Sequence, residues 1–420
     1  MTHRIRNYDV LATTPVRRDA LDIIEAGLVA IDTATTVRNH VRLDGNSLTI
    51  GTRSYDLSRY RNVRVFGFGK ASCQASAVME QILGTRLHAG ISIGTGTNAC
   101  RTIKVCEASH PVPSSENVRH SGEIVAQCGT LSAEDLVLVI VSGGGSAMLC
   151  WPESECDQGI RLYEASVRKG LTIGELNVVR RHISSLKGGG LAKLLYPATV
   201  VGLIFSDVPG SMPDMVASGP TYPDTSTVAD AQAIIDRYEL GQYELLETPK
   251  DASLFKNVTN IVLISNETAL QAMSETAQSL GYDTDIIASD IYDEPPALVA
   301  RFTAAARAHS VILGGGESRL VIPVHGGHGG RNQYVALTAA RVLQSGQVFV
   351  SIASDGSDNN DSAGALVDDA TVKLATESGF DVNDALKKFD EHALLEEAGA
   401  LVFTGPTGAN VSDVMFLLTS

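Results

Sequence analysis

Short, uninterrupted apolar runs alternate with helix-favouring segments along most of this chain. The apolar runs span residues 63–68, 136–141, 199–205, 261–264 and 348–353. A continuous apolar run of this length is typical of a strand that is covered on both faces. Helix-favouring composition marks the segments between them, at residues 71–83, 157–170, 228–240 and 267–280. This alternation predicts an α/β fold with a mostly parallel sheet and helices on both of its faces.

Length and charge narrow the class of protein further. The 420 residues are enough for two or three domains with buried cores. The polar segment 241–260 is the best candidate for a boundary, so we predict one domain over residues 1–245 and a second over residues 246–420. The 48 acidic and 33 basic residues give a net charge of −15. This balance argues against a nucleic-acid partner, because such binding needs clustered Lys and Arg.

Three observations bear on where the protein acts. No apolar stretch approaches about 18 residues, so we expect no transmembrane helix and no membrane partner. Residues 1–19 lack the apolar core of a secretory signal. The six cysteines include no C-x-x-C pair, which favours reduced thiols. We therefore predict a cytoplasmic protein that acts on a small molecule, and a homodimer is compatible with the sequence.

The first of several glycine-rich turns follows the strand 63–68 and opens a helix. In open α/β sheets ligands bind outside the carboxyl ends of strands, and glycines there let the backbone approach an anion. Gly67 and Gly69 fit that role, and Lys70 would add a positive charge for a phosphate or carboxylate. The turn does not match a P-loop, and it lacks the third small residue and the ribose-binding acid of a dinucleotide site. Tight packing between strand and helix is the alternative explanation.

Three consecutive glycines follow the strand 136–141. Such a run costs conformational entropy, which a nest of backbone N–H groups around phosphate oxygens would offset. The turn does not match a serine-hydrolase elbow, which requires Gly-x-Ser-x-Gly. We predict a phosphate cradle, with a merely sharp turn as the alternative, at Ser142, Gly143, Gly144, Gly145 and Ser146.

The densest basic segment of this acidic chain lies between residues 175 and 190. On a helix, Asn177, Arg180 and Ser184 share one face, and Lys187 stands at another glycine turn. We predict that Asn177, Arg180 and Lys187 contact a substrate carboxylate or nucleotide phosphates. A solvated helix face is the alternative explanation.

Acidic residues follow two further strands. Asp207 lies just past the strand 199–205, where an acid can hold Mg²⁺ or accept a hydroxyl proton. Asp355 and Asp358 lie in an acidic loop after the strand 348–353. We predict that these two residues contact a metal or the substrate, and capped turns are the alternative.

Two glycine-rich segments, 314–317 and 326–333, bracket a predicted hairpin. The second segment ends at a predicted helix start, where Arg331 would hold a carboxylate or phosphate through two parallel hydrogen bonds. His325 and His328 lack a third ligand at a suitable spacing, so we predict no zinc site.

Several short motifs occur in order along residues 15–418 of this chain. They are Gly67–Ala71, His110–Pro113, Ser142–Ala147, Glu175–Arg180, Lys187–Gly189, Ser206–Gly210, Ser218–Thr221, Gly315–Glu317, Gly329–Gln333, Thr404–Gly408 and Asn410–Asp413. Taken together, they resemble the MOFRL-type (class II) glycerate 2-kinases, some of which are labelled hydroxypyruvate reductases. A single motif is weak evidence, and the specificity comes from the ordered set.

The resemblance implies two α/β domains, a larger Rossmann-like N-terminal α/β/α domain and a smaller C-terminal α/β MOFRL domain, with the site in the cleft. It implies transfer of the γ-phosphoryl group of ATP to the C2 hydroxyl of D-glycerate, with Mg²⁺ as cofactor. It also implies that Lys70 and Arg331 are the leading catalytic candidates, and its motifs add Glu317 and Asn332 as substrate or nucleotide contacts. Asp207 is our candidate for orienting or deprotonating the substrate hydroxyl.

The chain departs from the family pattern at two places. Ser211 stands where the family commonly has Asp, and the loop 354–361 lacks a glycine and a proline, although Asp355 and Asp358 keep their places. A reshaped loop would admit a bulkier hydroxy acid, so a kinase for another sugar acid is the main alternative. The other two alternative functions are a nicotinamide-dependent hydroxypyruvate reductase and a non-catalytic metabolite-binding protein.

Overall fold

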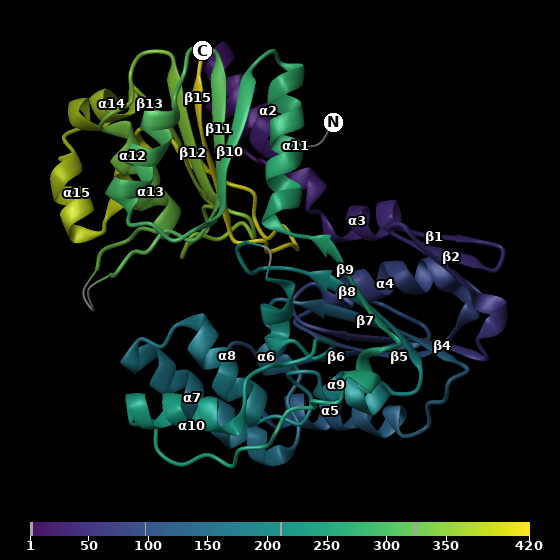
Figure 1. Cartoon of the computed structure of the whole chain (residues 1–420). Helices are drawn as coiled ribbons and strands as arrows, with labels where there is room; N and C mark the ends of the chain where they lie inside the picture. Colours follow the sequence, from purple (N-terminus) through teal and green to yellow (C-terminus); the bar gives the residue numbers. More distant parts are fainter. Residues whose placement is uncertain (1–2, 97, 211, 323–325) are drawn as a thin grey trace. The chain divides into compact units, whose positions relative to one another are not determined.

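The structure is a computed structural model that describes residues 3–96, 98–210, 212–322 and 326–420. Ser211 and His325, which entered the sequence analysis, lie outside the described residues. The chain forms two compact units (Figure 1). We call them the parallel-sheet unit, with Thr33–Ser206 and Met212–Leu263, and the mixed-sheet unit, with Met1–Asp32, Asp207–Ser211 and Ile264–Ser420.

Each unit combines segments that are distant in the sequence, so the division differs from the predicted boundary between residues 245 and 246. β9 (Val258–Ile264) lies beyond that position and is the last strand of the parallel sheet. At the other end of the chain, α2 (Pro15–Ala30) packs against α11 (Asn266–Ser279) of the mixed-sheet unit. A Cβ atom at Gly27 would lie 2.8 Å from Met273 Sδ, so the two helices approach closely there.

The sheet of the parallel-sheet unit forms its centre. In spatial order it consists of β6 (Ile103–Glu107), β5 (Leu87–Gly94), β4 (Asn62–Phe68), β7 (Asp135–Ser142), β8 (Thr199–Phe205) and β9. The pairs from β6 through to β8 are all parallel. β7 is buried along its whole length, as expected for a strand covered on both faces. The predicted strands 63–68, 136–141, 199–205 and 261–264 are therefore confirmed.

Helices cover both faces of this sheet. Figure 1 shows α4 (Ser72–Leu83) on one side, and α5 (Ser115–Cys128) and α9 (Gly190–Leu195) on the other. The unit's other helices are α3 (Thr33–His40), α6 (Gly145–Met148), α7 (Glu153–Lys169), α8 (Ile173–His182) and α10 (Val228–Tyr238). A small antiparallel sheet of β1 (Val41–Asp44), β2 (Ser47–Ile50) and β3 (Arg53–Asp56) precedes β4. Short 3₁₀ turns are η1 (Leu57–Arg59), η2 (Gly84–Arg86), η3 (Pro213–Ser218) and η4 (Ala252–Phe255).

The mixed-sheet unit has a sheet in which most neighbouring strands run antiparallel. Its spatial order is β10 (Asp283–Ile291), β11 (Ser310–Gly316), β15 (Asp413–Thr419), β12 (Gln347–Ala353), β13 (Gly364–Asp368) and β14 (Leu401–Val402). Among the described strands of this sheet only the β10–β11 pair is parallel, and β15 runs antiparallel to both of its neighbours. The expectation of a mostly parallel sheet therefore holds for the other unit and not for this one.

Helices also cover both faces of the mixed sheet. α2 and α11 lie on one face, and α12 (Pro295–Ala305) and α13 (Arg331–Ala340) lie on the other (Figure 1). The remaining helices are α1 (Tyr8–Leu11), α14 (Thr371–Glu377), α15 (Val382–Lys388) and α16 (Glu391–Glu397). In the stretch predicted as a hairpin, residues 318–322 form no strand, and residues 323–325 lie outside the described residues. The α/β class and the two-domain organisation are confirmed.

Two expectations about composition can be compared with the described part of the chain. None of its helices has the length and apolar character needed to cross a bilayer. All six cysteines are free thiols.

Candidate active site

Three predicted ligand-binding turns follow neighbouring strands of the parallel sheet. Phe68 of β4 pairs with Val141 of β7, and Ser142 of β7 pairs with Phe205 of β8. The turns after these strands therefore lie at one edge of the sheet, where open α/β folds bind ligands.

The turns after β4 and β7 are tied to each other. The Lys70 backbone N–H donates to the Gly143 carbonyl at 2.8 Å, and the Ala71 N–H donates to Ser142 Oγ at 3.1 Å. Gly69 has φ of +111°, and a Cβ atom there would lie 2.3 Å from Ser142 Oγ. Only glycine fits this approach. The Ser142 side chain thus joins the two turns inside the protein.

Gly67 has a role in packing. A Cβ atom at this position would lie 2.9 Å from Ser92 Oγ and 3.0 Å from Ser76 Oγ. These hydroxyls belong to β5 and α4, so glycine lets the helix approach the sheet. This is the alternative that the sequence left open.

Gly144 lies between two basic side chains. It has φ of +79°, and a Cβ atom there would lie 2.9 Å from His110 Cδ2 and 3.3 Å from Lys70 Cγ. The Lys70 side chain is exposed, and its ammonium makes no hydrogen bond or ion pair with any described residue. Desolvation and then the positive charges of Lys70 and Arg180 lower the pKa of the His110 imidazole to about 4. The side chains of Lys70 and His110 thus lie against this loop, and the charge of Arg180 acts on His110.

Arg180 is the most unusual of these groups. It lies on α8, which begins with a capping box in which Thr172 Oγ1 accepts from the Glu175 N–H and the Glu175 carboxylate accepts from the Thr172 N–H. Burial lowers the pKa of the Arg180 guanidinium to about 10, against smaller effects of Tyr163 and Glu155. Within the described ranges this guanidinium has no hydrogen bond and no ion pair. A desolvated cation without an anion is costly, so the arrangement favours an anionic ligand.

The neighbouring residue Arg181 shows the contrast. Its guanidinium donates to Asp224 Oδ1 at 2.9 Å and to the Asp214 carbonyl at 3.0 Å. Arg181 is thus neutralised within the fold, and the sequence pattern alone does not distinguish it from Arg180.

Asn177 and Ser146 belong to a polar chain through Ser218. Ser218 Oγ donates to Asn177 Oδ1 at 2.8 Å and lies 2.9 Å from Ser146 Oγ, and Asn177 Nδ2 donates to the Met215 carbonyl at 3.3 Å. Asn177 and Ser218 are buried, whereas Ser146 is half-buried. Of the three side chains, Ser146 is the one that reaches the surface. Asn177 is buried and forms hydrogen bonds with Met215 and Ser218.

Lys187 occupies a different place from the predicted one. Its ammonium is buried, pairs with the Glu155 carboxylate and donates to the Leu149 carbonyl at 2.7 Å. Leu149 directly follows α6, so this buried pair fixes the end of the glycine loop's helix. The prediction that Lys187 contacts a ligand is corrected to an internal structural role, because a buried ammonium is retained where a carboxylate neutralises it.

In the mixed-sheet unit, the predicted residues gather where β11 and β12 end and β15 begins. Ala353 of β12 pairs with Asp413 of β15. Arg331, the first residue of α13, donates from Nε to Asp413 Oδ2 at 2.7 Å and from Nη1 to Glu317 Oε2 at 2.9 Å. Burial raises the pKa of the Asp413 carboxyl to about 7, and the charge of Arg331 opposes that rise. Arg331 and Glu317, which were each predicted as site residues, thus form an ion pair, and both are partly open to solvent.

Asp358 and Asn332 are buried and form hydrogen bonds with each other. Asp358 Oδ1 accepts from the Asn332 N–H at 3.0 Å, and its Oδ2 accepts from the Gln333 N–H at 2.9 Å. Asn332 Oδ1 accepts from Ser351 Oγ at 2.6 Å, and all these side chains are buried. Asp358 therefore caps the amino end of α13. The predictions of Asp358 as a metal ligand and Asn332 as a ligand contact are corrected to this role.

Two predicted acids remain at the surface. Asp355 is half-buried, and its Oδ1 accepts from the Ser357 N–H at 3.1 Å, which leaves Oδ2 without a partner among the described residues. Asp207 is half-buried and follows β8, but the segment that it begins belongs to the mixed-sheet unit. In that segment the Gly210 N–H donates to the Ser289 carbonyl at 2.8 Å.

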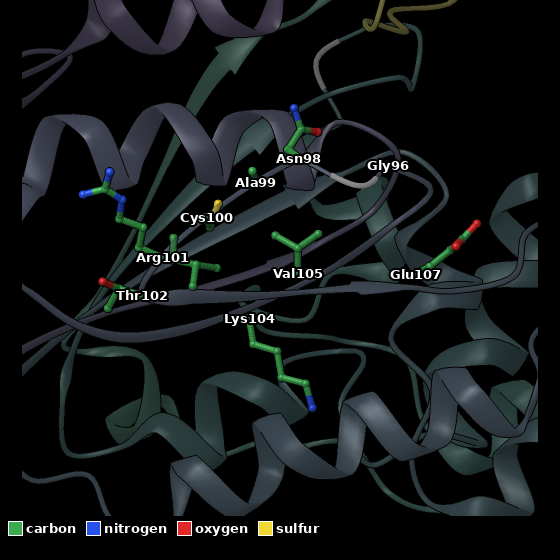
Figure 2. A pocket seen from close by; sticks show the side chains of 10 residues that line it. Gly96, Asn98, Ala99, Cys100, Arg101, Thr102, Lys104, Val105 and Glu107 are labelled. Atoms are coloured by element: carbon green, nitrogen blue, oxygen red, sulfur yellow. The ribbon is translucent and has the colours of Figure 1, made fainter.

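A cavity of about 550 Å³ lies beside β6 and the loop before it (Figure 2). None of the predicted site residues lines it. Lys104 pairs with Glu123 at 2.6 Å, and Glu80 accepts from the Arg101 N–H at 2.6 Å. Burial raises the pKa of the Cys100 thiol to about 11, so this thiol stays protonated near neutral pH. The charged groups here are engaged locally, and we assign the cavity no function.

Two residues that matter for the geometry were not selected as site residues from the sequence. His110 and Asp413 lie within quoted motifs, yet no spacing rule connects either of them to Lys70 or Arg331. The sequence signal that could have identified them is their place in the motifs His110–Pro113 and Asn410–Asp413.

The fold and these turns define a class, namely two-domain α/β proteins with glycine-rich turns at the carboxyl ends of their strands. A domain of unknown function, DUF4147, matches residues 19–248, and the MOFRL family matches residues 310–413. The chain belongs to this DUF4147–MOFRL family, that of the class II glycerate 2-kinases.

Individual relatives cover nearly the whole chain. Glycerate 2-kinase of Pyrococcus horikoshii is 30% identical over 96% of this chain and 98% of that protein. D-glycerate 2-kinase of Thermotoga maritima is 34% identical over 83% and 88%, and a putative hydroxypyruvate reductase of Agrobacterium vitis is 35% identical over 84% and 86%. The crystal structure of glycerate kinase from Thermotoga maritima superposes with a TM-score of 0.85 at 28% identity, over 96% of this chain and 99% of that one.

Proposed function

We propose that this chain is a glycerate 2-kinase, which transfers the γ-phosphoryl group of ATP to the C2 hydroxyl of D-glycerate. One observation carries the proposal: Lys70 lies against a glycine-rich turn, its charge and that of Arg180 act on His110 beside that turn, and neither cation has a carboxylate partner among the described residues. Such cations favour an anionic ligand, and both ATP and glycerate are anions. The glycerate 2-kinase activity of the relatives supports D-glycerate as the substrate.

Each proposed catalytic residue has a chemical role that suits its surroundings. Phosphoryl transfer depends on positioning and on neutralising charge that develops on the transferred group. Lys70 is exposed and uncommitted, so we assign it to that charge in the parallel-sheet unit. Arg331 is held in a fixed orientation by Asp413 and Glu317, which suits a bidentate contact to a phosphate or carboxylate. Asp207 would orient or deprotonate the C2 hydroxyl.

Mg²⁺ would accompany the nucleotide. This ion commonly takes one or two carboxylates from the protein and the rest of its ligands from phosphates and water. Asp355 fits this requirement because its Oδ2 is uncommitted, whereas both oxygens of Asp358 accept hydrogen bonds from α13. We therefore propose Asp355, with Asp207 as the second candidate, as the metal-binding acids. The ion would supply charge neutralisation between the phosphates.

Asn substitutions at Asp355 and Asp358 are expected to have different effects. Asp355→Asn should raise the Mg²⁺ concentration needed for half-maximal activity about 10–100-fold, the range typical of a disturbed metal site. Asp358→Asn should instead lower the free energy of unfolding by about 1–3 kcal/mol, because it removes a charged cap from α13. Mg²⁺ titration of activity and urea unfolding of both variants separate the two roles. A changed Mg²⁺ requirement in Asp358→Asn alone would contradict the assignment.

A kinase for a bulkier hydroxy acid is less well supported by the loop 354–361. Asn359 has φ of +66°, a left-handed conformation that Asn tolerates better than most residues. The residue that replaces the family's glycine can therefore hold the backbone conformation that glycine favours. This observation argues for D-glycerate as the substrate.

A substrate panel tests the proposal. ADP release is measured with Mg²⁺-ATP and D-glycerate, L-glycerate or a four-carbon sugar acid, and NADPH oxidation is measured with hydroxypyruvate. We expect the highest kcat/KM for D-glycerate and no NADPH oxidation. A higher value for the four-carbon acid would point to the alternative kinase, and NADPH oxidation would point to a reductase.

A further inference from the structure

His110 lies at the same sheet edge as the glycine-rich turns, although it belongs to none of them. It follows the carboxyl end of β6, after Ala108, whose N–H donates to the Gly94 carbonyl of β5 at 2.9 Å. The ring lies against Gly144, since a Cβ atom there would be 2.9 Å from His110 Cδ2 and 3.2 Å from its Nε2. Glycine at position 144 is what allows this approach.

Asn117 fixes the turn that carries His110. This residue of α5 is fully buried, and its Oδ1 accepts from the Ser109 N–H at 3.0 Å. Its Nδ2 donates to the carbonyls of Ser109 and Ala147, both at 2.9 Å. Ala147 lies in α6, directly after the glycine-rich turn. One amide side chain therefore joins the backbone before His110 to the helix that the turn begins, and it holds the imidazole beside Gly144.

The imidazole has no hydrogen-bond partner among the described residues, so both of its nitrogens are available. Lys70 and Arg180 are the charged groups that act on it, and both are cations. Glu155 partly offsets the burial of Arg180, but neither Lys70 nor Arg180 forms an ion pair with a described carboxylate. A ring with free nitrogens near two cations without ion-pair partners is suited to an anion that all three groups share.

We propose that His110 binds the same anion as Lys70 and Arg180, and that it takes up a proton from solvent when that anion is doubly charged. His110 thus makes anion affinity depend on pH. The inference rests on the proposed function, because the anion would be the phosphate or carboxylate of that reaction. In chemical class, the ligand is a tetrahedral oxyanion or a carboxylate.

The sign of the pH effect follows from the charges. Without the anion, desolvation and then the charges of Lys70 and Arg180 hold the pKa of His110 at about 4, so the ring is neutral at pH 7. A bound dianion stabilises the imidazolium and raises its pKa. Affinity should therefore increase as pH falls between the bound and free pKa values, by up to about tenfold per pH unit. It should be constant above the higher pKa value and below the lower one.

Sulfate is the probe for the experiment, because it remains a dianion throughout this pH range. Binding to the full chain is measured by calorimetry between pH 5 and 8, in buffers of different ionisation enthalpy, which gives the number of protons taken up. The ring of His110 is followed by NMR on protein with labelled histidines. The test variant is His110→Gln, which keeps a neutral polar side chain. The control variant is His88→Gln, which removes an exposed histidine of β5.

We expect wild type and His88→Gln to take up protons with sulfate and to bind it more tightly at lower pH. His110→Gln should still bind sulfate, more weakly and without this dependence on pH. The inference is overturned by equal proton uptake in His110→Gln, by a His110 resonance whose titration sulfate does not change, or by absence of sulfate binding to wild type. The NMR result on wild type decides the matter even if a variant fails to fold.

The test is separate from that of the proposed function. Sulfate binding is measured without turnover, so a chain that takes up protons through His110 but does not phosphorylate D-glycerate would refute only the proposed function. A chain that phosphorylates D-glycerate but shows no His110-dependent proton uptake would refute only this inference.

Discussion

Replacing Lys70 by Met is expected to lower kcat for D-glycerate by about 10²–10³-fold, while the protein keeps its fold. The ammonium of Lys70 is exposed and has no partner within the described residues, so its removal costs little stability. The loss would fall on the transition state, where a preorganised cation stabilises developing charge by this order of magnitude. Steady-state kinetics with varied ATP and glycerate measure the effect on kcat and on each KM.

A matched variant shows that the effect is local. Lys193→Met removes an exposed lysine of α9 to which we assign no role at the glycine-rich turns, and we expect its kcat to equal that of wild type. Thermal unfolding of both variants should match that of wild type. If Lys70→Met retains most of the wild-type kcat, then Lys70 takes no part in the chemistry.

Replacing Lys187 by Met is expected to lower the free energy of unfolding by about 3–5 kcal/mol, because Glu155 would be left buried without a counter-ion. Glu155 also accepts from the Trp151 N–H at 2.8 Å, and the chain has a single tryptophan. Fluorescence of Trp151 during urea unfolding therefore reports on this part of the structure.

The double variant Glu155→Met/Lys187→Met provides the control. It removes both charges, so it should be more stable than Lys187→Met alone. A structural role for Lys187 predicts this recovery, whereas a ligand-binding role predicts wild-type stability in Lys187→Met with a raised KM. The second result would restore the prediction made from the sequence.

The course of the backbone was largely predictable from local sequence. Uninterrupted apolar runs coincide with β4, β7, β8 and β12 to within a residue or two, because these strands are buried on both faces. The assignment of α2 and β9 to their units was not predictable in this way. It depends on contacts such as Gly27 with Met273, which join residues far apart in the chain.

Residue types at the site were predictable, but the directions of their side chains were not. Lys187 and Arg180 both lie in one basic segment, yet Lys187 meets Glu155 inside the protein and Arg180 meets no carboxylate among the described residues. Asp358 and Asp355 likewise share one loop, and only Asp358 lies within reach of the free N–H groups of α13. Each outcome depends on tertiary neighbours, which the spacing of residues in the sequence does not contain.

The most direct test of the account is the product of the reaction itself. The chain is incubated with D-glycerate and Mg²⁺-ATP in the presence of enolase, which accepts 2-phosphoglycerate and not 3-phosphoglycerate, and phosphoenolpyruvate is measured. A glycerate 2-kinase predicts phosphoenolpyruvate formation at the rate of ADP release. ADP release without phosphoenolpyruvate, or no ADP release at all, would contradict phosphorylation of the C2 hydroxyl by this protein.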